Sequence, residues 1–489
     1  MKDHKNVCDK KMNYNECELA ILRMNVDEAQ AKMSKRIVNS PEIKEIFKIV
    51  EGFIKKKNLV CYGGISINAL LPNEDKIYNE DIDLPDYDMF SPNSIEDAKE
   101  LADIFYENGY TEVEARSGQH YGTNKVFVNF IGVADITGIN KELFKAIKKK
   151  AIRVNGILYT DPNFLRMSMY LELSRPSGDT SRWEKVLKRL TLINKYYSLS
   201  NVKCNDIDFQ RKMEHDKQSD KIFEIVKNTL IHEDSVFFGG YAISEYSKYM
   251  PDNLRKKVEK YADFDVLSRD PKTTSEIVKE RLNEEGIKNV KIIKRDSIGE
   301  VIPLHYEIQV GRDTVAFIYK PIACHSYNVI MESGKKIKIA TIDTMLSFYF
   351  AFLYANKPYY NNERILCMAK FLFDIQQKNR LEQKGLLKRF SIICYGHQES
   401  VEEMRAEKTE KFKELKDKRG TKEFEEWFLN YRPGQIQKDS KNKNLIKEIK
   451  KENNSKSKSK VGYFGKENRK KSFKFKTWNN KTRKNNKIY

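Results

Sequence analysis

Residues 60–91 read VCYGGISINALLPNEDKIYNEDIDLPDYDMFS, and this stretch decides the fold that we expect. Its apolar start, closed by Gly63-Gly64, predicts a short buried strand and a tight turn, with a helix beginning after the glycines. Two Asp-x-Asp pairs follow, at 81/83 and at 86/88. Because side chains two positions apart on a strand share a face, either pair could hold a divalent cation against a phosphate.

The second half of the chain repeats this pattern in the same order. VFFGGYAIS matches VCYGGISIN, DFDVLS matches DYDMFS, and two later segments also correspond. The matched ranges are 60–68, 86–91, 126–136 and 157–170 in the first half, and 236–244, 263–268, 314–325 and 339–349 in the second. We interpret the pattern as an internal duplication of one α/β unit. The acidic pair that recurs is Asp86/Asp88, so Asp81 and Asp83 are predicted to be loop acids, with steering of metal or substrate as the alternative.

The first copy contains the parts of a phosphoryl- or nucleotidyl-transfer site. Glycines before a helix let a phosphate approach the backbone N–H groups, and the Ser66 hydroxyl could add a bond. Asp86 and Asp88 are expected to sit on the next strand, and Asp135 on a third strand that can pair beside it. Three carboxylates facing a phosphate cradle suit two-metal catalysis. Each part alone can be a tight turn or a strand-end hydrogen bond, but the ordered set is typical of the nucleotidyltransferase superfamily.

The second copy keeps the glycine pair and two of the three acids. Gly239-Gly240, Asp263 and Asp265 are present, and we align the third position with Cys324, beside His325. A copy that has lost a metal ligand is expected to persist as a scaffold or an RNA-docking surface. Residual nucleotide binding is the alternative, and Cys/His catalysis has less support.

Positive charge is concentrated in a tail. The 489 residues carry a formal net charge of +20, and residues 438–489 hold 19 Lys and Arg against 4 Asp and Glu. A Lys/Asn-rich segment with few apolar anchors is expected to be disordered in isolation. Lysines with interspersed aromatic residues suit single-stranded RNA, and a solvated basic tail or a localisation signal is the alternative.

Cysteine usage and hydropathy predict an intracellular protein. The seven cysteines are scattered without a CxxC pair or zinc spacing, so we expect reduced thiols. No run approaches 18 apolar residues, and the N-terminal stretch lacks the apolar core of a signal peptide. We therefore expect no membrane span and no secretory signal.

Residues 165–190, LRMSMYLELSRPSGDTSRWEKVLKRL, carry the most specific resemblance in the chain. With CYGHQESVEEMR (394–405) and FEEWFLNYRPG (424–434), this stretch resembles the catalytic poly(A) polymerase subunits of large cytoplasmic DNA viruses. The family includes poxvirus, asfarvirus and giant-virus enzymes, and the mimivirus-like members are the most similar. The resemblance extends from about residue 36 to residue 434.

The resemblance implies template-independent transfer of AMP from ATP to the 3′ end of single-stranded RNA, with two Mg²⁺ or Mn²⁺ ions. Catalytic and metal-binding roles fall on Asp86, Asp88 and Asp135, and nucleotide binding falls on Gly63, Gly64 and Ser66. It also implies a pseudo-nucleotidyltransferase C-terminal unit, a homodimer or a viral processivity partner, and a viral protein of the virion or the host cytoplasm.

The Arg-rich part of this stretch could present several cations on one helix face, through spacings near i+3, i+4 and i+7. The polar set is Arg166, Tyr170, Arg175, Arg182, Lys185 and Arg189. Arg182 and Lys185 are our candidates for binding ATP. The alternative for the set is structural packing and pairing.

We therefore expect an α/β (α+β) chain with two tandem nucleotidyltransferase-like palm units, the second degenerate, and a disordered basic tail. The expected divisions are an N-terminal helical segment (1–35), a catalytic domain (36–200), a pseudo-nucleotidyltransferase and helical domain (201–436) and the tail (437–489). The expected function is poly(A) tail synthesis on viral mRNA. Another RNA terminal nucleotidyltransferase or, with less support, an inactive RNA-binding scaffold is the alternative.

Overall fold

The computed structural model describes residues 7–8, 11–79, 81–204, 207, 218–255 and 263–434. The chain divides into a compact unit, Met1–Pro433, and a second unit, Gly434–Tyr489. The expected disordered tail, 437–489, lies outside the described residues. Within the described part, no helix has both the length and the apolar character needed to cross a membrane.

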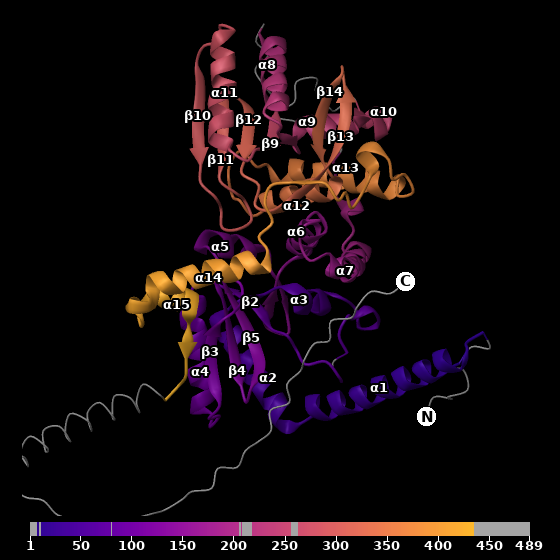
Figure 1. Ribbon diagram of the computed structural model, residues 1–489, viewed down its shortest axis with the longest axis vertical. Coiled ribbons are helices and arrows are strands. Elements are labelled where there is room, and N and C mark those ends of the chain that lie inside the picture. The colour runs from indigo at the N-terminus through magenta and orange to yellow at the C-terminus, as the bar shows by residue number, and fades with distance from the viewer. Residues whose placement is uncertain are drawn as a thin grey trace, which may run out of the picture. The chain divides into compact units, whose positions relative to one another are not determined.

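The first half builds a mixed eight-stranded sheet around the strand that ends at the glycine pair (Figure 1). β1 runs antiparallel to β2 and parallel to β7, and β2 runs parallel to β5. In spatial order the strands are β16 (Asn430–Tyr431), β3 (Val113–Ser117), β4 (Thr123–Val128), β5 (Ile131–Gly138), β2 (Asp88–Ser91), β1 (Val60–Cys61), β7 (Ile157–Tyr159) and β6 (Ile152–Val154). The outer strand β16 comes from the far end of the described chain and extends the sheet of the first half.

The second half builds another eight-stranded sheet. Its strands in spatial order are β10 (Val290–Arg295), β11 (His305–Val310), β12 (Asp313–Tyr319), β9 (Phe264–Leu267), β8 (Val236–Phe237), β14 (Lys335–Ala340), β13 (His325–Glu332) and β15 (Cys394–Tyr395). β8 is antiparallel to β9 and parallel to β14, and β9 is parallel to β12. The seven strands from β10 to β13 thus repeat the order of β3 to β6, so the sequence repeat coincides with two sheets of equal topology.

Helices flank both sheets. Those of the first half are α1 (Tyr14–Val38), α2 (Pro41–Lys57), α3 (Gly63–Leu70), α4 (Ser94–Glu107), α5 (Lys141–Lys150), α6 (Pro162–Leu173) and α7 (Trp183–Tyr196). Those that follow are α8 (Ser219–His232), α9 (Gly240–Tyr246), α10 (Asp252–Arg255), α11 (Pro271–Glu284), α12 (Ile342–Phe352), α13 (Asn362–Lys378), α14 (Val401–Leu415) and α15 (Lys422–Phe428). Short 3-10 turns are η2 (Asn73–Asp75), η3 (Thr180–Arg182), η4 (Leu199–Asn201), η5 (Ser247–Tyr249), η6 (Gly385–Leu387) and η7 (Lys416–Lys418).

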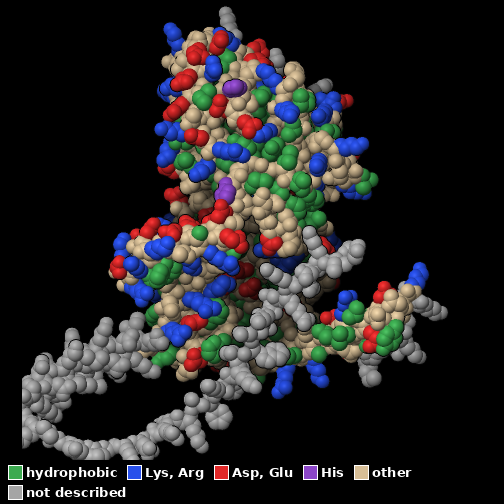
Figure 2. All heavy atoms as spheres, in the orientation of Figure 1, with side chains coloured by type: hydrophobic (Ala, Val, Ile, Leu, Met, Phe, Trp, Pro, Cys, Tyr) green, Lys and Arg blue, Asp and Glu red, His purple; other side chains and the backbone are tan. Residues whose placement is uncertain are grey.

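The N-terminal helix α1 is present where the sequence predicts a helix, but it does not pack as an amphipathic helix. Asn13 and Glu16 form a capping box at its start. Val38 is its single buried residue, and apolar side chains such as Leu22 and Met33 are exposed (Figure 2). The helix is therefore stabilised mainly by its cap and its own backbone bonds rather than by the core.

Two hydrophobic clusters hold the unit together. One lies between the first sheet and helices α2 and α4, with Val50, Met89 and Phe105 at its centre. The other begins under α3, α5 and α6 and continues through α12 and α13 into the second sheet. Helix α6 packs directly on α12, with the rings of Tyr170 and Phe350 stacked at 6.1 Å. The two halves consequently share this second cluster.

Candidate active site

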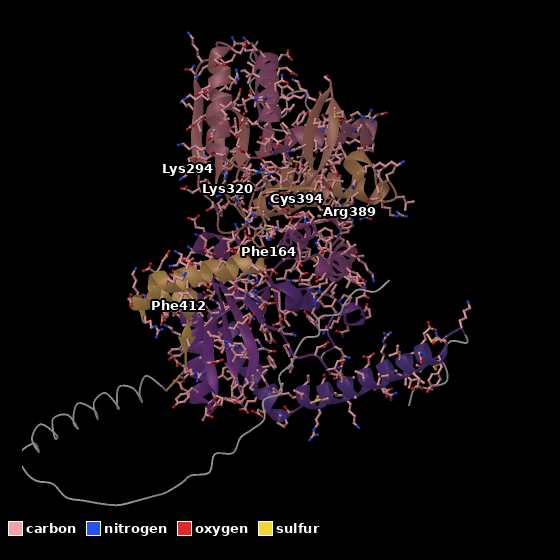
Figure 3. All side chains as sticks on the ribbon, viewed as in Figure 1. Phe164, Lys294, Lys320, Arg389, Cys394 and Phe412 are labelled. Atoms are coloured by element: carbon pink, nitrogen blue, oxygen red, sulfur yellow. A yellow bond between two sulfur atoms is a disulfide. The ribbon has the colours of Figure 1, made fainter. Side chains whose placement is uncertain are left out.

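A cleft of about 1370 Å³ lies beside the glycine turn of the first sheet. One wall contains Gly63, Gly64, Asp86 and Asp88, and another is formed by α6, η3 and α7. A further wall comes from the second half of the chain, through the loop 297–304 and residues 320–322. Phe164 and Lys320 are two lining residues that Figure 3 labels, one on α6 and one just after β12.

The glycine turn presents the open N-terminus of a helix to this cleft. Gly63 has φ of +69°, and a Cβ there would lie 3.0 Å from Asp88 Oδ2, so a side chain is disfavoured on both counts. The cap residue of α3, Tyr62, makes no side-chain capping bond. The first N–H groups of α3 are thus suited to bind an anion.

Gly64 is required for a different reason. A Cβ at this position would lie 2.1 Å from the hydroxyl oxygen of Tyr78. Arg189 Nη2 donates a hydrogen bond of 3.0 Å to that oxygen, and the Asn68 side chain accepts from the Tyr78 backbone N–H. Tyr78 is therefore held against the start of α3 from two sides, and it lines the cleft.

The structure brings two of the three predicted carboxylates into register. Asp88 at the start of β2 is paired with Asp135 on the parallel strand β5. Asp86 precedes β2, is exposed and lines the cleft with Asp88. Asp135 does not line the cleft, and its carboxylate is bound by Lys125 of the neighbouring strand β4. Asp83 instead accepts a bond from the Asn79 N–H, as expected of a loop acid.

The charges around Asp88 indicate whether these residues are suited to bind a cation. Burial, and then the nearby carboxylates of Asp86 and Asp135, raise the pKa of Asp88 to about 7. A divalent cation would relieve both effects, and carboxylate oxygens are the ligands that Mg²⁺ and Mn²⁺ prefer. The described residues hold no group of three His, Cys, Asp or Glu side chains already close enough to enclose a metal. The donor chemistry therefore fits a cation, while Asp135 is engaged by Lys125.

The predicted nucleotide-binding residues divide into those that line the cleft and one that does not. Ser66 is fully buried, and its hydroxyl donates to the Cys61 carbonyl, so it stabilises the strand-to-helix turn. Arg182 and Lys185 line the cleft, and Arg182 is paired with Glu172 at 3.1 Å. The chain thus places two candidate cations, but not the candidate hydroxyl, where a ligand could contact them.

The remaining polar residues of the Arg-rich stretch fall into a buried group and a group that lines the cleft. Arg166 is buried and donates to Asn163, Asn194 and the Tyr197 carbonyl, so its role is structural. Tyr170 is fully buried against α12. Arg175 and Arg189 line the cleft together with Arg182 and Lys185.

In the second half, Phe317 stands at the position equivalent to Asp135. Asp265, the counterpart of Asp88, is paired with Phe317 in the same way that Asp88 is paired with Asp135. Our alignment of Cys324 with Asp135 is therefore wrong. The segments Val-Ala-Asp-Ile (133–136) and Val-Ala-Phe-Ile (315–318) show the replacement directly in the sequence. The Phe317 ring is buried where a carboxylate would stand.

The expectation of reduced thiols is wrong for six of the seven cysteines. Disulfides join Cys8 to Cys17, Cys204 to Cys367 and Cys324 to Cys394. The remaining thiol, Cys61, is buried in β1. Two of these bonds connect residues 163 and 70 positions apart, which a search for short spacings cannot reveal.

Sequence reasoning missed Tyr78 as part of this site. The signal was weak, because Tyr78 lies in a loop between two motifs and its contact with Gly64 depends on the fold. The spacing of Arg189 marks it as a candidate, but its hydrogen bond to Tyr78 depends on the fold.

Comparisons with known proteins found matches to a part of the chain that includes the glycine turn and the three aspartates. Residues 48–179 match the family model described as the poly(A) polymerase catalytic subunit. An African swine fever virus protein (isolate Tick/Malawi/Lil 20-1/1983) named as a poly(A) polymerase catalytic subunit is 37% identical over 182 residues, covering 36% of this chain and 38% of the relative. A protein so named from Acanthamoeba polyphaga mimivirus is 31% identical over 183 residues, covering 36% of this chain and 30% of the relative.

A solved structure extends the likeness to the whole fold. The crystal structure of the Megavirus polyadenylate synthase matches with a TM-score of 0.73 at 22% identity, over 92% of this chain and 93% of that chain. The sequence matches span less than two-fifths of the curated relatives' length, whereas the mixed α/β fold is shared along nearly the entire chain. The resemblance seen in the sequence is thus supported by the match of residues 48–179 to the family model of the poly(A) polymerase catalytic subunit and by the viral relatives of that segment.

Proposed function

We propose that the protein is a template-independent poly(A) polymerase that transfers AMP from ATP to the 3′-hydroxyl of viral mRNA. The observation that carries the proposal is the register of Asp88 and Asp135 beside the open N-terminus of α3. This arrangement lies within the segment that matches the family. Arg182 and Lys185 on the facing wall add positive charge for a triphosphate.

In this mechanism the protein positions the reactants and stabilises charge. The N–H groups of Gly63 and Gly64 and the cations Arg182 and Lys185 bind the triphosphate of ATP. Asp86, Asp88 and Asp135 would hold the divalent ions, Mg²⁺ or Mn²⁺, that the resemblance implies. Bound ions would lower the pKa of the RNA 3′-hydroxyl and neutralise the departing pyrophosphate.

We assign the second half, residues 201–436, as a pseudo-nucleotidyltransferase and helical unit beside the catalytic domain, 36–200. Its Asp263 and Asp265 remain, but the Phe317 ring replaces the third carboxylate. Action in the virion or host cytoplasm, a homodimer and a viral processivity partner stay predictions of the resemblance.

The proposal is tested by primer extension. The purified chain is incubated with 5′-labelled oligo(A) RNA, Mg²⁺ or Mn²⁺, and each nucleoside triphosphate in turn. Long extension with ATP alone is the expected result. Preferred addition of another nucleotide would assign a different terminal nucleotidyltransferase, and RNA binding without any addition would favour an RNA-binding scaffold.

Tyr78 gives a more specific prediction. Its oxygen accepts a bond from Arg189, so the phenol keeps its own hydrogen to donate to a phosphate oxygen at the start of α3. We expect Tyr78→Phe to raise the KM for ATP about ten-fold with a smaller change in kcat, because a hydrogen bond to a charged group contributes about 1.5–3 kcal/mol. Steady-state extension kinetics measure both constants.

The matched control for this prediction is Tyr106→Phe. Tyr106 is an exposed tyrosine on α4 outside the cleft, and its replacement should leave both constants unchanged. A Tyr78→Phe variant with the KM of the unmodified protein would show that Tyr78 only packs against Gly64.

A further inference from the structure

A second, smaller pocket of about 220 Å³ adjoins the cleft. The two cavities share Tyr121, Glu300, Glu399 and Glu426. Three distant parts of the chain build it: the β3–β4 turn, the loop before β11, and the segment from residue 399 to α15. The pocket exists only when these parts have assembled around the same cleft.

Its position relative to the carboxylates is fixed by hydrogen bonds across the sheet. Tyr62, which precedes the glycine pair, shares a 2.9 Å hydrogen bond with the Thr137 hydroxyl, and Thr137 in turn bonds Thr123 at 3.0 Å. The Gly138 N–H donates to the Gly122 carbonyl. The turn that carries Tyr121 is thus tied to β5, the strand of Asp135.

Aromatic rings form one side of the pocket. The rings of Tyr121 and Trp427 lie 4.4 Å apart with a tilt of 40°. Tyr121 is 55% exposed despite this contact, so it offers ring area to a ligand in the cavity. An aromatic pair with one exposed ring, Tyr121, and one half-buried ring, Trp427, beside the cleft suits stacking of a nucleobase.

Carboxylates form much of the remaining lining. Glu300, Glu399, Glu407 and Glu426 are present with one cation, Lys408, whose ammonium donates to the Gly118 carbonyl. Such a lining repels phosphates, which excludes the RNA backbone and a triphosphate from the pocket. Carboxylate oxygens do accept hydrogen bonds from the exocyclic amino group of a base.

The triphosphate is expected on a different wall. Arg182 and Lys185 belong to η3 and α7, and Figure 1 shows α7 and α15 on opposite sides of β2. The pocket beside α15 is therefore available to the RNA strand rather than to the incoming nucleotide.

We propose that the Tyr121–Trp427 pocket binds an adenine base of the RNA strand close to its reactive 3′ end, by stacking and through its 6-amino group. This proposal rests on the proposed function for the identity of the RNA, since a tail made of AMP presents adenine at every upstream position. The pocket favours a strand that already ends in adenosines.

Trp427 supplies a binding readout that needs no catalysis. Oligo(A) and oligo(U) RNA are titrated without ATP or divalent ions, and tryptophan fluorescence is compared between the unmodified protein and Trp427→Phe. We expect oligo(A) to quench the emission of the unmodified protein and to have a much smaller effect on Trp427→Phe.

Binding constants then test the two kinds of contact. Tyr121→Ala is expected to weaken oligo(A) binding about ten-fold or more, because it removes the exposed ring on which the base would stack. Glu426→Gln should reduce the preference for oligo(A) over RNA carrying purine bases that lack the 6-amino group. Tyr106→Ala is the matched control, since Tyr106 is exposed but lies outside both cavities.

Equal affinity for oligo(A) and oligo(U), unchanged by Tyr121→Ala, would overturn the proposal. Quenching by a lysine-rich peptide but not by oligo(A) would overturn it too, and would assign the pocket to a basic peptide. Oligo(A) binding at Trp427 without ATP addition would sink the proposed polymerase activity while supporting this pocket. The two failures are therefore distinguishable.

Discussion

Asp88→Asn is expected to reduce ATP-dependent extension of oligo(A) by a factor of about 10²–10³, while the protein stays folded. Asp88 is central to the candidate site, because its carboxylate lies beside Gly63 and is in register with Asp135. An amide of the same shape keeps the packing but loses the negative charge that holds a divalent cation. Loss of one preorganised electrostatic contact in an active site typically lowers kcat by about 10²–10³.

Two control variants show whether the loss of extension is specific to Asp88. Asp81→Asn removes an exposed carboxylate of the preceding loop, and Asp265→Asn changes the equivalent strand position in the second half. Both should retain near-normal extension. Extension is followed on denaturing gels, and circular dichroism verifies the fold. An Asp88→Asn protein that still extends RNA at the original rate would remove Asp88 from the catalytic machinery.

The largest effect on stability is expected from Arg389→Met, at about 3–5 kcal/mol in the free energy of unfolding. Arg389 donates to both carboxylate oxygens of Asp343, at 2.5 and 3.2 Å, and Asp343 is 1% exposed. Removing the guanidinium leaves a buried carboxylate without its charged partner, which is the costly way to break an ion pair. Figure 3 labels Arg389 near the segment that leads to β15.

Urea unfolding followed by fluorescence measures this change. The double variant Asp343→Asn/Arg389→Met should recover part of the loss, because it leaves no unpaired buried charge. Lys188→Ala removes one member of an exposed pair with Glu184 and should leave the free energy of unfolding nearly unchanged. A difference that small for Arg389→Met would contradict the assignment of a strong buried pair.

The sequence predicts the sheets well because their strands carry local signals. A glycine pair after an apolar run and an Asp-aromatic-Asp segment each mark one strand end, and the same signals recur near residues 239 and 263. Asp86 and Asp88 are placed by this argument at the cleft where the structure has them. Alignment of less patterned segments is weaker, which is why Cys324 was matched to Asp135 in place of Phe317.

Contacts between distant segments could not be predicted from one sequence. The Tyr121–Trp427 pocket joins two residues about 300 positions apart, and Tyr78 meets Gly64 through a loop whose path depends on Asn68. The side chain of Ser66 has the right sequence position for a ligand contact but turns into the protein. Direction of a side chain is set by the packed fold rather than by motif spacing.

The stacking of Tyr170 on Phe350 has an evolutionary consequence. Asp161 caps α6 after β7, and Thr341 caps α12 at the equivalent place after β14. Tyr170 and Phe350 each lie nine residues after the cap of their own helix, so they occupy equivalent positions in the two halves. A position that contacts its own counterpart lies on a two-fold axis, which is the hallmark of an isologous dimer interface. If the two halves descend from the duplication that the sequence repeat predicts, this contact would mark where two identical copies first packed on one another.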